Sequence, residues 1–287
     1  MSEYLQRFAG IGRLYGLAAL QAFEQTHVCV IGIGGVGSWA AEALARSGIG
    51  HITLIDLDDV CISNTNRQLH ALQSTIGQDK VAVMAARIRD INPACQVYQV
   101  EDFVSSDNLR ELLSTEFSYV IDCIDSVKAK TALIVHCKRH KIPLVTIGGA
   151  GGQLDPTQIQ LADLSQTVYD PLLAKVRNNL RREHNYSRNP KRRFGIDAVY
   201  STEQLKYPKA DGSVCQAKPQ ASEAGQGMRL DCSGGFGAVT VVTASFAFVA
   251  VSRVLKKLAD KANSKTAASN QPEQHETADM TTERTAD

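Results

Sequence analysis

A glycine-rich turn is the first feature of the sequence with a chemical consequence. Gly32-Ile33-Gly34-Gly35-Val36-Gly37 follows an apolar run and precedes a helical pattern, the context that G-x-G-x-x-G requires. Glycines there let the backbone approach a phosphate, and the helix that follows contributes free N–H groups. Asp56 stands nineteen residues after Gly37, at the end of the next apolar run, where a carboxylate could bind ribose hydroxyls. The pattern predicts a site for NAD or another adenine nucleotide.

Polar residues beyond this turn favour a nucleotide with more charge. They are Asp58, Asn64, Asn66, Arg67, Gln68 and Lys80. The pyrophosphate of NAD rests on backbone groups and needs no added cation, whereas a triphosphate does. We therefore expect Arg67 and Lys80 to contact phosphates, with the side-chain amides as neutral donors. Each cation taken alone is equally well explained as a solvated surface charge.

Two carboxylates end a later apolar run, in Asp122-Cys123-Ile124-Asp125. A carboxylate at this edge of a sheet can hold Mg²⁺ between phosphate oxygens. We predict Asp122, Asp125 and the neighbouring Ser126 as nucleotide-binding residues, and Asp125 as the magnesium ligand. The alternative is that Asp125 only caps the helix that begins at Ser126. The chain has no G-x-x-x-x-G-K-[ST] motif, so a P-loop enzyme is excluded.

Alternating strand and helix patterns position these residues. Strands are expected at 27–32, 51–56, 96–100, 118–124 and 143–148, and helices at 38–47, 80–91, 106–113 and 126–140. This alternation predicts an α/β fold with a Rossmann-like, doubly wound, mostly parallel sheet. We expect a nucleotide-binding domain over residues 1–152. Residues 153–260 would form the C-terminal part of the same fold, an extension of strands with a long basic crossover loop and an apolar helix.

Composition limits the class of protein, and charge is unevenly distributed in the C-terminal third. The 287 residues are 44% hydrophobic with a net charge of +1, which fits a globular chain and excludes a generally acidic or basic one. Residues 175–193 nevertheless carry eight Lys or Arg against one acid. Residues 233–252 hold no charge; their polar and glycine residues favour a buried helix over a membrane span. Residues 261–287 read as a disordered tail.

The seven cysteines form no C-x-x-C pair, which argues against a disulfide scaffold and a four-cysteine zinc site. The N-terminus lacks a signal pattern, so we expect a cytoplasmic protein. Cys232 precedes Ser-Gly-Gly-Phe-Gly, where a thiol could act as a nucleophile or sulfur relay. A buried structural thiol is the commoner case, and Cys232 is kept as a candidate catalytic residue beside Arg67, Lys80 and Asp125.

As a set, these motifs resemble the ATP-dependent adenylating enzymes related to ubiquitin-activating enzyme, which include the activators of ThiS and MoaD. The resemblance covers residues 7–152 and rests on G-I-G-G-V-G-S, the D-x-D at Asp56, N-x-N-R-Q, Lys80 and D-C-I-D. It implies that ATP adenylates a carboxylate and releases pyrophosphate. It also implies a homodimer in which an arginine near the N-terminus reaches the phosphates of the partner subunit. Arg13 matches that arginine best.

Relatives that activate sulfur carriers usually have two C-x-x-C pairs for zinc, so their absence implies another branch without zinc. Residues 145–160, 207–215 and 231–238 resemble the branch that acts on threonylcarbamoyladenosine in tRNA, which extends the likeness over 7–258. That branch implies ATP-driven activation of the threonylcarbamoyl carboxylate and cyclisation with loss of water. Because the nucleophile lies within the substrate, an enzyme thiol is not obligatory. The resemblance also implies Mg²⁺, a monovalent cation (Na⁺ or K⁺) and a link to a cysteine desulfurase and its sulfur acceptor.

The basic segment 175–193 agrees with a tRNA substrate, because a polyanion needs phosphate contacts. Tyr186 and Phe194 could stack on bases, although a solvated, mobile loop explains the segment equally well. Three other functions are considered. Missing cysteine pairs disfavour an adenylating activator of a ubiquitin-like sulfur-carrier protein, and Arg67, Lys80 and Asp125 disfavour an NAD-dependent oxidoreductase. A non-enzymatic scaffold would not gather so many polar groups at one sheet edge.

Overall fold

A seven-stranded sheet forms the centre of the protein. The computed structural model describes residues 2–113, 115–209, 211–217 and 236–269. The strand order is β3-β2-β1-β4-β5-β7-β6, with β6 antiparallel to β7 and the other neighbours parallel. The strands are β1 His27–Ile31, β2 His51–Ile55, β3 Gln96–Val100, β4 Tyr119–Asp122, β5 Leu144–Ile147, β6 Ile159–Asp163 and β7 Asp197–Ser201. The predicted α/β fold with a doubly wound, mostly parallel sheet is confirmed.

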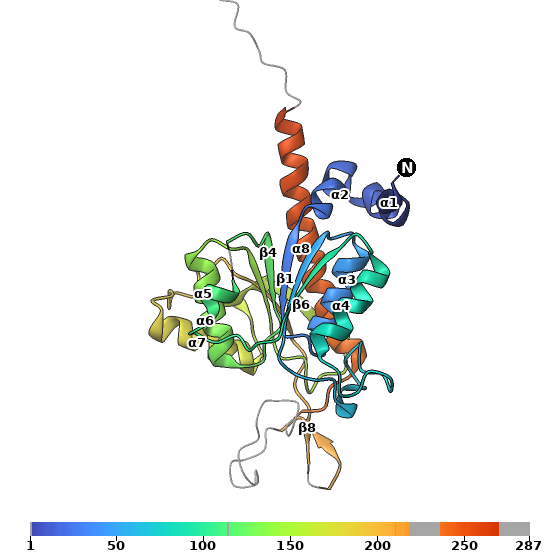
Figure 1. Ribbon diagram of the computed structural model, residues 1–287. Coiled ribbons are helices and arrows are strands. Elements are labelled where there is room, and N and C mark those ends of the chain that lie inside the picture. Colours follow the sequence, from blue (N-terminus) through green and yellow to red (C-terminus); the bar gives the residue numbers. More distant parts are fainter. Residues whose placement is uncertain (1, 114, 210, 218–235, 270–287) are drawn as a thin grey trace, which may run out of the picture.

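The helices cover both faces of this sheet and the end at which β1 begins (Figure 1). They are α1 Glu3–Tyr15, α2 Leu17–Glu24, α3 Gly37–Arg46, α4 Lys80–Ile91, α5 Leu109–Leu112, α6 Val127–Arg139, α7 Pro171–Glu183 and α8 Thr240–Ser269. One apolar core lies between the sheet and α3, α4 and α8, and a second lies under α5, α6 and α7. Strands β4 and β5 are buried along their whole length, as expected for parallel strands covered on both faces.

The strand order places a topological switch point between β1 and β4. The chain leaves β1 toward one face of the sheet and leaves β4 toward the other, so the two loops separate at the carboxyl ends of these strands. Ligands bind at such points in open α/β sheets. The glycine-rich turn after β1 and the Asp125 loop after β4 are therefore brought to one place.

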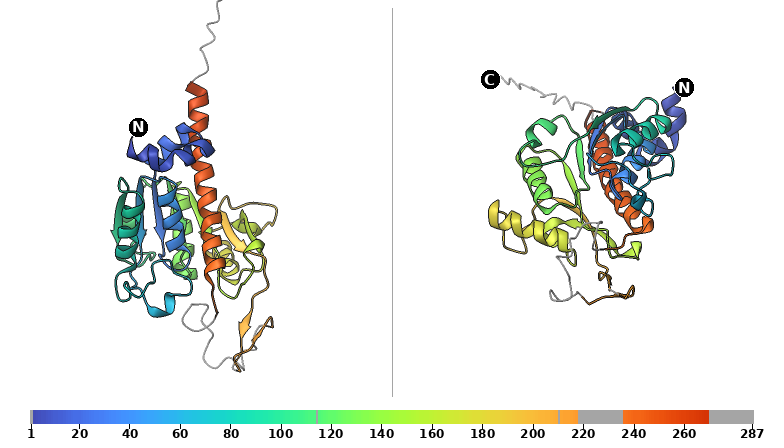
Figure 2. Two further views of the ribbon diagram at one scale, coloured as in Figure 1. Left: turned by 90° about the vertical axis from the view of Figure 1, so that its right-hand side faces the viewer. Right: turned by 60° about the horizontal axis from the view of Figure 1, so that its bottom comes forward.

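Helix α8 begins inside the uncharged segment and runs along one face of the sheet and past α2 (Figure 2). Val242, Phe246, Ala250 and Val254 recur at a spacing of four and are all fully buried. The buried helix expected there is confirmed, although Phe248 on its other face is half exposed. Within the ranges that the structure describes, no helix combines the length and apolarity needed to cross a membrane.

Three expected elements differ from the structure. Helix α8 continues to Ser269, so residues 261–269 are helical rather than part of a disordered tail; their alanines and lysines are good helix formers. The helix expected over 106–113 shrinks to α5, because the Asn108 side chain accepts from Ser105 N and holds a turn before it. The basic crossover loop begins instead as helix α7, which the charge run obscured.

Helix α7 has ordinary helical signals beneath its charges. Asp170 caps it and Pro171 occupies its first turn. Leu173, Val176 and Leu180 are fully buried at spacings of three and four. Beyond the helix, the rings of Tyr186 and Phe194 pack edge to face with centroids 4.9 Å apart, and Phe194 is buried. The buried ring of Phe194 is not available to stack on a base, whereas base stacking by the partly exposed Tyr186 stays a prediction.

Candidate active site

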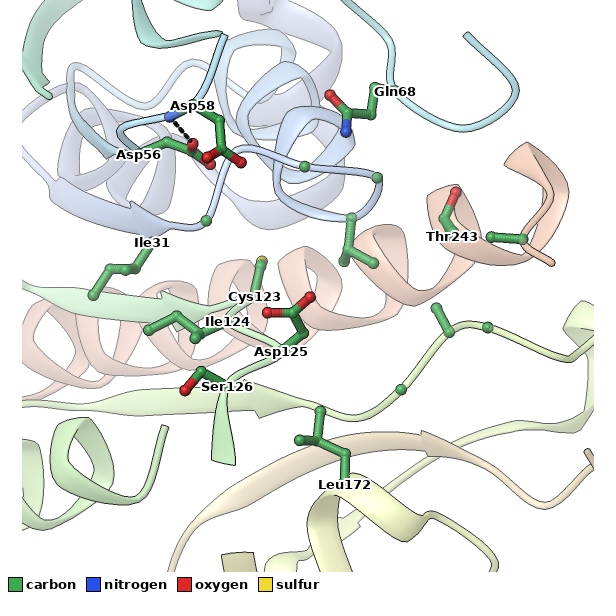
Figure 3. Close-up of a pocket in the computed structure, with 18 of the residues that line it drawn as sticks. Ile31, Asp56, Asp58, Gln68, Cys123, Ile124, Asp125, Ser126, Leu172 and Thr243 are labelled. Carbon is green, nitrogen blue, oxygen red and sulfur yellow. Dashed lines mark hydrogen bonds between the residues drawn. The ribbon is translucent and has the colours of Figure 1, made fainter. Parts of the chain in front are cut away.

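A cavity of about 570 Å³ opens at the switch point, where the loops after β1, β2 and β4 converge (Figure 3). Its lining includes most of the residues predicted from the sequence: Gly32, Gly34, Gly35, Asp56, Asp58, Asn64, Arg67, Gln68, Lys80, Asp125 and Ser126. Residues separated by almost a hundred positions therefore share one site. The structure brings together the glycine turn, both proposed phosphate ligands and the proposed magnesium ligand.

The glycines of the turn have different tasks. Gly32 has a φ of +84°, and a Cβ there would lie 3.1 Å from the carbonyl oxygen of Cys123, so it permits close approach of the β1 and β4 loops. A Cβ on Gly37 would lie 1.8 Å from the oxygen of Gly32. Gly37 does not line the cavity; it allows α3 to pack directly against the turn. A Cβ on Gly35 would press on the stem of Arg67, at 3.1 Å.

Asp56 shapes the cavity as well as lining it. One carboxylate oxygen accepts the N–H of Ile33 at 2.6 Å, and the other accepts the N–H of Asp58 at 2.9 Å. Burial raises the pKa of Asp56, and the nearby Lys80 ammonium opposes that rise. The carboxylate thus ties the turn after β1 to the loop after β2, which fixes the two walls between which a ribose would lie.

Lys80 stands at the first residue of α4 with only 6% of its side chain exposed. Its Nζ lies 2.7 Å from Oδ2 of Asp58 and 3.8 Å from Oδ1 of Asp56. His70 is buried nearby. Its pKa is lowered to about 4, mainly by burial and to a smaller extent by the charge of Lys80, so this histidine is neutral at pH 7. Lys80 therefore presents a positive charge at a desolvated position in the cavity wall.

Arg67 is held from several sides. Its Nη1 donates to the oxygen of Ser63 at 2.8 Å and to Oδ1 of Asn66 at 3.0 Å. The indole of Trp39 donates to the carbonyl oxygen of Arg67 at 3.1 Å. The guanidinium carries no ion pair with a described carboxylate, so its charge is available to a phosphate. Asn64 and Gln68 are buried beside it and line the same cavity.

The two aspartates after β4 have separate environments. Asp122 is completely buried, with Oδ2 at 2.8 Å from Nζ of Lys130 and at 2.7 Å from the donating hydroxyl of Thr146. It cannot reach a nucleotide, and its assignment as a nucleotide ligand is corrected. Asp125 lines the cavity, its side chain exposed, with no hydrogen bond or ion pair to any residue that the structure describes. Ser126 caps α6, so the capping alternative for Asp125 does not hold.

A magnesium site in this cavity would be completed by the nucleotide. Among the described residues, no three His, Cys, Asp or Glu side chains gather closely enough to enclose a metal. Mg²⁺ commonly uses one or two carboxylates together with phosphate oxygens. The carboxylate of Asp125, which pairs with no side chain in the described ranges, fits that mode of binding at the cavity wall and would supply the protein ligand.

Two other predicted residues do not line the cavity. Asn66 donates to the oxygen of Ala238 at 2.7 Å and thereby ties its loop to the segment before α8. Arg13 is exposed on α1, which leads through α2 into the amino end of β1, so it lies at the other end of the sheet (Figure 1). Cys232 lies outside the described residues. Cys123 does line the cavity, and burial raises its thiol pKa far above the usual value, which disfavours a thiolate there.

Sequence reasoning missed the far wall of the cavity. It includes Gly148–Gly151 after β5, Leu172 on α7, Phe236 in the segment before α8 and Thr243 on α8. The glycine run after an expected strand was a usable signal for the first of these, because such a run lets backbone approach a ligand. Nothing in the local pattern around Leu172 or Thr243 indicates a cavity, since only the tertiary fold brings them there.

Comparison with known proteins agrees with this geometry. The sequence profile of the ThiF family matches residues 6–286. The chain is 59% identical over 257 residues to the tRNA threonylcarbamoyladenosine dehydratase of Escherichia coli, covering 90% of this chain and 95% of that one. It is 55% identical to the Haemophilus influenzae enzyme of the same name, covering 91% and 96%. A solved structure of the E. coli enzyme in complex with ATP matches with a TM-score of 0.80 at 53% identity, covering 92% of this chain and 98% of that one. The chain therefore belongs to the ThiF family.

Proposed function

We propose that this protein uses ATP to activate the carboxylate of threonylcarbamoyladenosine in tRNA and closes that side chain with loss of water. The observation that carries the proposal is the cavity in which Arg67, Lys80 and Asp125 converge beside the glycine turn. The high identity to dehydratases over nine-tenths of the chain selects this reaction among those that an adenylating site could perform.

The side chains suggest how the reaction proceeds. The glycine turn and Asp56 would hold the nucleoside, and Arg67 and Lys80 would neutralise the phosphates that become pyrophosphate. A carboxylate oxygen of the substrate attacks the α-phosphorus, and the bond to the departing pyrophosphate breaks. A nucleophile within the same substituent then attacks the activated carbonyl, loses its proton and expels AMP. Mg²⁺ held by Asp125 would supply charge neutralisation on the phosphate oxygens.

Mass analysis of tRNA nucleosides tests the reaction directly. After incubation of tRNA containing threonylcarbamoyladenosine with the protein and ATP, we expect that nucleoside to lose one water, with AMP and pyrophosphate formed in equal amounts. Omission of ATP is the control and should leave the nucleoside unchanged. An unchanged nucleoside in the complete reaction would refute the proposed function.

The resemblance adds further features to the proposal. In a homodimer, Arg13 of one subunit would reach the phosphates bound by the other. A monovalent cation, a cytoplasmic location and a link to a cysteine desulfurase with its sulfur acceptor belong to the same proposal. The absence of C-x-x-C pairs from the sequence supports a protein without structural zinc.

The tRNA would lie on the basic surface formed by α7 and the loop after it. The first turn of α7 lies beside the cavity, because Leu172 lines it. Replacing the exposed residues Lys175, Arg182, Arg192 and Arg193 by Gln should weaken tRNA binding. The dependence of log K on log salt should flatten by about one unit for each lost phosphate contact. Filter binding across a salt series measures both quantities.

A matched control removes the same charge elsewhere. Lys256, Lys257, Lys261 and Lys265 are exposed on the distal half of α8. Their replacement by Gln should change neither affinity nor salt dependence appreciably. Equal losses from both sets would show that bulk charge, rather than the α7 surface, attracts the RNA.

A further inference from the structure

The far wall of the cavity is held by one buried carboxylate. Oδ2 of Asp170 accepts the N–H of Gly149 at 2.9 Å, and a Cβ on Gly148 would lie 1.8 Å from the same oxygen. Asp170 is only 3% exposed, and burial raises its pKa while its backbone donors oppose that rise. The glycine loop after β5 can therefore take its position only because Asp170 fits against a bare backbone.

The other oxygen of Asp170 begins the basic helix. Oδ1 accepts the N–H of Leu173 at 2.9 Å, which makes Asp170 the N-cap of α7. The next residues, Pro171 and Leu172, line the cavity, and Lys175 follows at the surface one turn later. A single side chain thus joins the first turn of α7 to the cavity wall, through two hydrogen bonds of equal length.

The same loop is also fixed by other buried groups. Nε2 of Gln153 donates to the oxygen of Gly149 at 3.0 Å, and Glu203 accepts the N–H groups of Leu154 and Asp155. Asp170 is the one contact among these that comes from α7. A displacement of this helix would therefore reach the backbone N–H of Gly149 through Asp170, and the cavity directly through Pro171 and Leu172.

We propose that Asp170 is a positioning residue that couples tRNA docking on α7 to the Gly148–Gly151 wall against which the threonylcarbamoyl group lies. The inference rests on the proposed function, because it assigns the RNA to α7 and the acceptor group to this wall. When tRNA phosphates contact α7, Asp170 keeps the Gly148–Gly151 wall at a fixed position relative to the nucleotide, which would lie on the opposite side of the cavity. Catalysis is sensitive to such register, since misplacement by about 1 Å can cost about a hundredfold in rate.

Asp170→Asn is the isosteric test. An amide cannot accept from both N–H groups, so one end of the link is lost while the side-chain volume is kept. We expect kcat for tRNA-dependent dehydration to fall by about tenfold to a hundredfold, with KM for ATP and Kd for tRNA within about twofold. Asp170→Ser, which retains a capping oxygen but is too short to hold Gly149, should show the same split.

Asp163→Asn is the matched control. Asp163 also accepts several backbone N–H groups, from Ser165, Phe194 and Gly195, but none of these belongs to the Gly148–Gly151 wall. Its kcat should stay near that of the wild type when rates are expressed per folded enzyme, determined by circular dichroism and active-site titration. A purely structural role for Asp170 would lower the folded fraction and leave kcat per folded enzyme unchanged.

The outcomes separate the two proposals. Suppose that the wild type dehydrates the tRNA. The proposed coupling is then wrong if Asp170→Asn reacts equally fast, or if its affinity for ATP falls by the same factor as its rate. In either case the proposed function stands. If the wild type itself leaves the nucleoside unchanged, the proposed function is wrong, and the coupling is overturned with it.

Discussion

Lys80→Ala should reduce ATP-dependent turnover by at least about a hundredfold, because it removes a preorganised charge from a desolvated site. The ammonium lies 2.7 Å from Asp58 in a wall of the cavity, where a phosphate would take over part of that interaction. Arg67→Ala should give a loss of similar size, since no described carboxylate neutralises its guanidinium. Release of pyrophosphate from the tRNA reaction measures both effects.

The fold should survive these changes. Asp58, the nearer partner of Lys80, is more than half exposed, so it is solvated once the lysine is gone. Arg89→Ala is the control: Arg89 lies on α4 as well, contacts the oxygen of Val97 and is remote from the lining of the cavity. Normal turnover by Lys80→Ala or Arg67→Ala would remove that residue from the proposed phosphate site.

Lys130→Met should produce the largest loss of stability. Lys130 and Asp122 are both completely buried and 2.8 Å apart, and the ammonium also contacts the oxygen of Asp122 and the hydroxyl of Thr146. Removing one partner of a buried pair leaves a desolvated charge, which costs about 3–5 kcal/mol of unfolding free energy. Urea denaturation followed by circular dichroism measures this loss.

Two further variants isolate the cause. The double variant Lys130→Met with Asp122→Leu removes both charges and should recover part of the stability, because an apolar pair can replace a buried ion pair, although the Thr146 hydroxyl and the Ile124 N–H lose the acceptor that Asp122 supplies. Lys128→Met, on an exposed position of the same helix, should change stability by no more than about 0.5 kcal/mol. A loss below about 1 kcal/mol for Lys130→Met alone would mean that Asp122 is accommodated without its partner.

The sequence was most informative where one local pattern decided the structure. The helix predicted over 80–91 has those bounds, because Asp79 and Asn92 flank a regular apolar spacing. The convergence of the glycine turn, Arg67 and Lys80 also followed from sequence, since parallel strands bring their carboxyl ends to one edge. These predictions needed only periodicity and a general rule of sheet topology.

The incorrect predictions concern residues whose environment is set by tertiary packing. Asp122 and Asp125 look equivalent in the sequence, yet Asp122 ends β4 against Lys130 of α6 and Asp125 lies in the loop beyond. The lysine eight residues after Asp122 gave no sign that it would turn inward. The charges of 175–193 likewise conceal the apolar spacing of α7, because the cap at Asp170 and the first buried leucines come before the first lysine.

The position of Arg13 has a consequence for how the enzyme behaves on dilution. Arg13 and the cavity lie at opposite ends of one chain's sheet. In the proposed homodimer, each phosphate site would therefore receive its arginine from the other subunit. Activity would then depend on protein concentration. Specific activity would decline once that concentration falls below the dissociation constant of the dimer. In mixed assemblies, a subunit lacking Arg13 would silence the pocket of its intact companion while its own continued to work.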